Sequence, residues 1–88
     1  MLRISTIQSS GDPVTLRVEG EVKGLWVAEL RRVCEEALAR EVRLSLDLAG
    51  VSFIDAAGIN LIRALRERRV LLANPSSFIS EQIGGSES

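Results

Sequence analysis

The sequence predicts one α/β domain in which helices cover a single mixed sheet of four strands. Segments with an apolar residue at every second position, typical of strands, alternate along the chain with segments whose apolar residues recur at helical spacing. The length of 88 residues provides one hydrophobic core and not two. We expect the domain to span residues 1–83, with residues 84–88 forming a flexible C-terminal tail.

Two strands and a turn are predicted at the start of the chain. Residues 2–8 contain alternating apolar and polar positions and run into a Ser-Ser-Gly-Asp-Pro stretch, which is rich in turn-forming residues. Val14, Leu16 and Val18 then alternate with polar residues, as in a strand with one face on the core. We expect this second strand to end near Gly20.

An amphipathic helix over residues 25–40 and a third strand over residues 43–48 are predicted next. The apolar stripe of the helix consists of Trp26, Val27, Leu30, Val33, Cys34, Ala37 and Leu38. The three leucines of the strand alternate with polar residues and are expected to face the core. A large apolar residue at the position of Trp26 is more often part of a core than an exposed binding aromatic, and both interpretations stay open.

The second helix is expected to begin after a link formed by residues 51–55. Asp55 is well placed to cap this helix, because its side-chain oxygen can accept the unpaired backbone N–H groups of the first turn. Gly58 opens an apolar stripe that continues at helical spacing as far as Leu65.

A short strand and a last helix complete the predicted order. Residues 70–73 are apolar, and Asn74 and Pro75 provide a cap and a first-turn proline for a short helix with Phe78 and Ile83 pointing inward. The resulting order is β-β-α-β-α-β-α. Its strand-helix-strand units favour parallel pairing with right-handed crossovers.

The composition excludes most enzyme chemistry. The chain contains no histidine and no tyrosine, which removes catalytic triads, Cys-His pairs and the common zinc motifs. The glycines are too scattered for a phosphate-binding loop, and the carboxylates lie mostly on helix faces that solvent would cover. Cys34 lies on an apolar helix face, which predicts core packing and a raised thiol pKa. We therefore expect no enzyme activity, no metal site and no cofactor.

Charge and hydropathy restrict the partners and the location. Eleven basic and twelve acidic residues leave a formal charge of -1, which gives no field that attracts nucleic acid. The longest apolar runs are far shorter than the roughly 20 residues that cross a bilayer, so we expect no membrane insertion. The start of the chain lacks the apolar segment of a signal peptide, and a single cysteine agrees with a reducing compartment. A cytoplasmic protein is the expectation.

Residues 46–62, LDLAGVSFIDAAGINLI, resemble the signature of STAS domains, a family named for sulfate transporters and anti-sigma antagonists. The family's usual pattern is a strand ending in Asp-Leu, a Val-Ser-Phe-Ile-Asp connection, and a Ser-Ser-Gly or Ser-Thr-Gly opening of a helix. Gly20 and Glu21 resemble the family's GELD corner before the first helix. The resemblance in element order covers residues 2–83 and implies a STAS-like fold.

This resemblance also implies a binding function with an altered switch. In anti-sigma-factor antagonists of the family, a partner kinase that is also the anti-sigma factor phosphorylates the serine after the Asp, and the phosphate blocks binding. Here Ala56 and Ala57 occupy this position and the next, so the phosphosite is degenerate. Lys23 replaces the aspartate of the GELD corner. Both alanines are also good helix formers for a first turn.

The leading hypothesis is a non-catalytic protein-interaction domain in bacterial regulatory partner-switching, with an anti-sigma factor or kinase-like protein as partner. The expected partner-binding residues are Gly20, Glu21, Lys23, Asp55, Ala56, Ala57, Gly58, Ile59 and Asn60. Ile59 is expected on the flank of its helix beside two arginines, either exposed to a partner or covered by the last helix or a loop. The alternatives are an accessory subunit of a membrane transporter or lipid-trafficking ABC complex, and a small-ligand sensor with a groove at the sheet edge.

Overall fold

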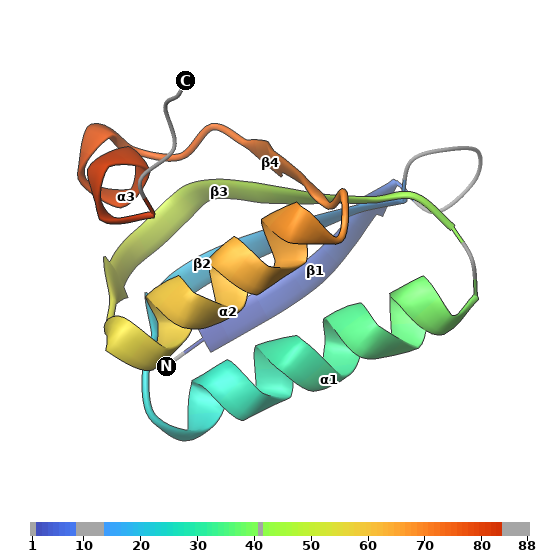
Figure 1. The fold of residues 1–88 in the computed structure, drawn as a ribbon, viewed down its shortest axis with the longest axis horizontal. Coiled ribbons are helices and arrows are strands. Elements are labelled where there is room, and N and C mark those ends of the chain that lie inside the picture. Colours follow the sequence, from blue (N-terminus) through green and yellow to red (C-terminus); the bar gives the residue numbers. More distant parts are fainter. Residues whose placement is uncertain (1, 9–13, 41, 84–88) are drawn as a thin grey trace.

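The computed structural model describes residues 2–8, 14–40 and 42–83, which form a four-stranded sheet with its helices packed against one face (Figure 1). The elements are β1 (Leu2–Gln8), β2 (Val14–Val22), α1 (Leu25–Ala39), β3 (Leu44–Ile54), α2 (Ala56–Glu67), β4 (Leu71–Ala73) and α3 (Ser77–Gln82). The predicted α/β class and the predicted order of elements are confirmed. None of the helices in this described part is long and apolar enough to cross a membrane.

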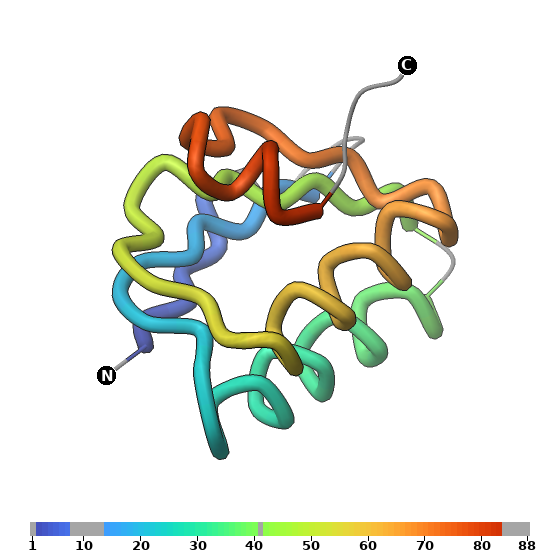
Figure 2. Tube along the Cα trace, turned by 60° about the vertical axis from the view of Figure 1, so that its left-hand side comes forward, coloured from blue at the N-terminus to red at the C-terminus, as the bar shows by residue number. Residues whose placement is uncertain are grey.

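The sheet is mixed, as predicted, with its strands in the order β1-β2-β3-β4. β1 and β2 pair antiparallel, whereas β2 with β3 and β3 with β4 pair parallel. Each parallel pair needs a crossover connection, which α1 and α2 supply. The two helices run side by side in the same direction over one face of the sheet, as both views show (Figures 1 and 2).

The core lies between this face of the sheet and the helices. Leu44, Leu46 and Leu48 of β3 are buried, which confirms that these leucines face the core, and Ser45 between them is buried as well. Cys34 of α1 is also fully buried, and burial raises the pKa of its thiol to about 12. The cysteine is therefore a packing residue, as expected.

The centre of the chain differs from the sequence prediction. β3 is 11 residues long and includes residues 51–54, which we expected to be a link. β2 likewise continues past Gly20 to Val22, because its last residues pair with the end of β3, where Val22 lies opposite Ile54. The irregular registers between these strands interrupt the alternation, so the pattern did not reveal the strand ends.

The last helix begins later than predicted. Its cap is Ser76, whose hydroxyl oxygen accepts the backbone N–H of Ile79 at 3.2 Å, whereas Asn74 has a left-handed φ of 56° before the helix. Ile79 and Ile83 are four positions apart and are buried on one face of this segment, whereas Phe78 lies off that face and is exposed. The inward position of Ile83 is confirmed, and that of Phe78 was wrong.

Trp26 is exposed rather than part of the core stripe of α1. It lies in the first turn of the helix, beside Leu2 and Ile4 of β1, where it lines an open hollow. The buried residues of α1 are Val27, Leu30 and Cys34.

Candidate partner-binding site

Asp55 is the N-cap of α2, as its position in the sequence predicted. Its Oδ1 accepts the backbone N–H of Gly58 at 2.8 Å, which satisfies one of the free donors of the first turn. The backbone N–H groups of Gly58 and then Gly24 lower the pKa of the Asp55 carboxyl from its usual value of 3.8. The carboxylate is therefore ionised across the physiological range.

The same carboxylate connects two segments that are far apart in the sequence. Asp55 Oδ2 accepts the backbone N–H of Gly24 at 3.1 Å, and the backbone N–H of Asp55 donates to the carbonyl of Val22 at 3.1 Å. Gly24 has a φ of 55°, a conformation that favours glycine, and it precedes the first residue of α1. Asp55 thus holds the corner of residues 20–24 against the start of α2.

Gly58 allows α2 to approach the ends of β2 and β3 closely. A Cβ atom at this position would lie 2.7 Å from Cγ1 of Ile54 and 2.8 Å from the carbonyl oxygen of Val22. Such distances are shorter than carbon contacts allow, so glycine is required for this packing. Gly58 is buried, so it positions the start of α2 against the strands and is not itself exposed to a partner.

Ile59 is buried, with 8% of its surface exposed, so the expectation of an exposed contact residue was wrong. One turn along the same flank, Arg63 donates to the backbone carbonyls of Gln82 and Ile83 at 3.0 and 3.3 Å. The end of α3 therefore covers this flank of α2, which was the alternative interpretation. Ile59 belongs to the same core cluster as Ile83.

The remaining predicted residues meet at one end of the molecule, where α2 begins. Ala56, Ala57 and Asn60 are exposed in the first turns of α2, and Lys23 is exposed on the neighbouring corner. Glu21 is half-buried and forms an ion pair with Lys23 at 3.6 Å. The structure thus brings together residues that lie more than 30 positions apart, through the bond between Gly24 and Asp55.

Two apolar side chains beside these residues were not predicted. Leu25 is 89% exposed at the start of α1, and Phe53 is 44% exposed near the end of β3. The ammonium of Lys23 lies 5.8 Å from the centroid of the Phe53 ring, a cation-π distance. Phe53 alternates with the buried Ile54, so recognition of residues 51–54 as a strand would have predicted its exposure.

We call the exposed residues of this end the docking surface, and it consists of Lys23, Leu25, Phe53, Ala56, Ala57 and Asn60. Residues 55–60 carry no hydroxyl, thiol or amine that could accept a phosphoryl group. Within the described residues, no group of three or more Cys, Asp or Glu side chains is arranged to hold a metal ion.

The fold and this surface together define a small α/β domain built around a capped helix start. Residues 5–81 match the model of the family described as "Mlab, STAS domain", so the chain belongs to this family of STAS domains. The match spans most of the chain and confirms the resemblance seen in the sequence.

A solved structure, that of the anti-sigma factor antagonist SpoIIAA in its unphosphorylated form, is similar in fold. The TM-score is 0.74 at 20% sequence identity, and the similarity covers 96% of this chain and 84% of that one. A comparison with curated protein sequences finds no significant match.

Proposed function

We propose that this chain is a non-catalytic, cytoplasmic protein-interaction domain that binds a protein partner through the docking surface. The observation that carries the proposal is the exposed first turn of α2, held in place by Asp55 and flanked by exposed apolar side chains. Membership of the STAS family and the fold similarity to an anti-sigma factor antagonist support a role in regulatory partner-switching. An anti-sigma factor or kinase-like protein is the corresponding partner.

The proposed binding is not switched by phosphate at the start of α2. A phosphate there would add about 1.5 to 2 negative charges within the interface and displace a partner. The side chains of Ala56 and Ala57 cannot accept a phosphate, so this chain remains able to bind its partner at all times. Regulation of the binding then depends on the state or the amount of the partner protein.

A second candidate is an accessory subunit of a membrane transporter or lipid-trafficking ABC complex. The two alanines favour it, because a permanent subunit needs no phosphate switch. The identity of the bound protein separates the two: an anti-sigma kinase in the first case, and a transporter ATPase in the second.

Site-specific photocrosslinking in cells tests the proposed surface. A photoreactive p-benzoylphenylalanine replaces Ala57 in one variant and Ala39 in the control, which is exposed at the far end of α1, about 20 Å along that helix from the corner. We expect a specific crosslinked protein from position 57 and not from position 39. Equal yields at both positions, or none at position 57, would contradict the proposal.

Charge variants provide a second measure once the partner is identified. Ala57→Asp places a carboxylate in the first turn of α2, where the helix dipole favours it, so the fold should remain intact. We expect it to weaken binding at least about tenfold, because the added charge loses its water at the interface. Ala39→Asp is the matched control and should bind as the unmodified chain does. Phosphate mapped to residues 55–60 after treatment with an anti-sigma kinase would also refute the proposal.

A further inference from the structure

β1 is an edge strand of the described sheet, and the features that normally protect such edges are scarce on it. Its sequence, LRISTIQ, contains one charged residue and no proline. A register irregularity between Thr6 and Gln8 is confined to its end. An edge strand of this kind presents unpaired backbone N–H and C=O groups on which another strand can add.

An apolar groove accompanies this edge on the helix side of the sheet. α1 packs on β2 and β3, so the helix-facing side of β1 is left partly uncovered. Two hollows of about 340 and 290 Å³ lie between β1 and α1, and Thr6, Leu16 and Val33 line both. The two hollows therefore adjoin each other between β1 and α1, and we call them together the groove.

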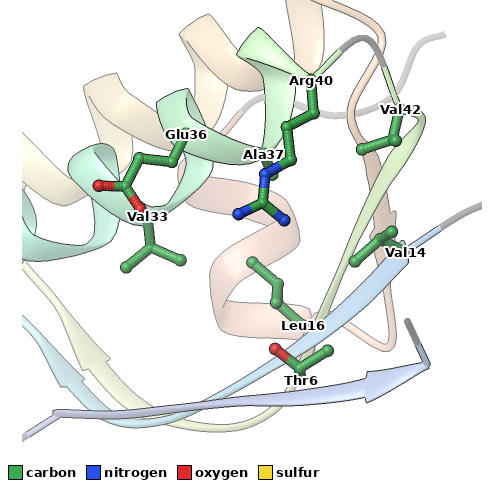
Figure 3. Close-up of a pocket in the computed structure, with 8 residues that line it drawn as sticks. All are labelled: Thr6, Val14, Leu16, Val33, Glu36, Ala37, Arg40 and Val42. Carbon is green, nitrogen blue, oxygen red and sulfur yellow. The ribbon is translucent and has the colours of Figure 1, made fainter. Parts of the chain in front are cut away.

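The two ends of the groove carry opposite charges. Glu29 lines the end beside Leu2, whereas Arg40 lines the end beside Val42. Figure 3 shows the Arg40 side chain extended over the hollow toward Leu16. Arg40 makes no side-chain hydrogen bond or ion pair with any residue that the structure describes. The other two charged side chains of the groove, Glu29 and Glu36, both pair with Arg32.

We propose that the occupant of this edge and groove is a second copy of the chain, paired through β1 about a two-fold axis. β1 and α1 run in the same direction, because Leu2 lies beside Trp26 and Thr6 lies beside Arg40. A two-fold axis beside β1 reverses both elements in the second copy. The strands then pair antiparallel, and Arg40 of each copy meets the end of the groove that holds Glu29 in the other.

The dimensions of the sheet agree with this pairing. Adjacent strands lie about 4.8 Å apart, so α1, which packs on β2 and β3, would lie about 14 to 19 Å from its symmetry copy. Packed helices are about 8 to 10 Å apart, which leaves a layer for side chains between the two copies of α1. Leu2 and Ile4, on the helix side of each β1, fill this layer in the other copy's groove. Of the docking surface, Lys23 and Leu25 lie nearest to this interface, since they line a hollow together with Glu29.

Analytical ultracentrifugation of the full chain tests the dimer. We expect a monomer-dimer equilibrium in which the dimer fraction increases as the chain concentration is raised to about 1 mM. At that concentration even a dimer with a millimolar Kd is substantially formed. Thr6→Lys places a cation in the groove of each copy and should raise the Kd at least about tenfold. Ala64→Lys, exposed on α2, is the matched control and should leave the Kd unchanged.

A charge exchange tests the two-fold arrangement itself. Arg40→Glu alone and Glu29→Arg alone should each raise the Kd about tenfold, because two symmetric pairs are lost at once. The double variant restores both pairs in reversed order and should return the Kd to that of the unmodified chain. Circular dichroism confirms that each variant is folded. The inference is overturned by a chain that stays monomeric, by a dimer that Thr6→Lys leaves intact, by a failure of the double variant to recover, or by a different protein or peptide copurifying in the groove.

Discussion

Replacing Gly58 by alanine tests how closely α2 approaches the strands beneath it. The new Cβ atom would lie within 3.0 Å of three atoms, which belong to Ile54 and Val22. One of the three is the carbonyl oxygen of Val22, a backbone atom that cannot rotate away. The substitution therefore forces α2 away from the corner rather than being absorbed by a flexible side chain.

The expected change in stability has two opposing contributions. Alanine in place of glycine within a helix usually stabilises by about 1 kcal/mol. Overpacking of a core costs about 1 to 3 kcal/mol, and a clash with backbone at Gly58 lies at the upper end of this range. The difference is a net loss of about 2 kcal/mol, which corresponds to a fall in Tm of about 10 °C for a domain of this size.

Chemical denaturation followed by circular dichroism measures this loss. Ala64→Gly, at an exposed position of the same helix, is the control and should cost about 1 kcal/mol from helix propensity alone. If Gly58→Ala leaves the free energy of unfolding unchanged or raises it, the close approach of α2 to Val22 is wrong. The docking surface would then not be positioned by close packing at Gly58.

Three further predictions concern the core and the cap. Leu65→Ala removes a buried side chain of α2 and should lower the free energy of unfolding by about 2 to 5 kcal/mol in urea denaturation; a loss below about 1 kcal/mol would show that the site is not packed as described. The thiol of Cys34, with a pKa of about 12, should react with aromatic disulfides only at the rate of unfolding, and fast stoichiometric labelling of the native protein would contradict its burial. Because the pKa of Asp55 is lower in the folded chain, the stability that its ionised form contributes is complete above the usual value of 3.8 and is lost as the pH falls through the lower folded value. The carboxyls of Asp47 and Glu21 also have lowered pKa values and cause part of the loss of stability in acid. Asp55→Asn should remove only the remaining part, measured as the free energy of unfolding below about pH 4, and an unchanged pH dependence would exclude Asp55 as a source.

The order of the elements was predictable because each one carries a strong local pattern. Leu44, Leu46 and Leu48 alternate with polar residues, and the stripe of α1 around Leu30 recurs at helical spacing. The capping role of Asp55 was predictable for the same reason, since a cap acts within three residues of its own position. Local chemistry alone determines these features.

Features that depend on distant segments were not predictable. The bond from Gly24 to Asp55 spans 31 positions, and no pattern in either segment indicates the other. Ile59 is buried because α3 lies over its flank, and the position of a six-residue helix follows from tertiary packing rather than from its sequence. Leu25 and Phe53 belong to the docking surface for a similar reason, since their exposure depends on where neighbouring elements end.

The Asp55 carboxylate has a further consequence for the kinetics of association. Both of its oxygens are already occupied by backbone N–H groups of the chain itself, and Lys23 is paired with Glu21. The charges of Lys23 and Glu21 offset each other, so the ionised Asp55 leaves this end with one net negative charge, which gives only a weak field to guide a partner from a distance. Encounter rates at this end of the molecule should accordingly change little with ionic strength, as diffusion without electrostatic steering requires.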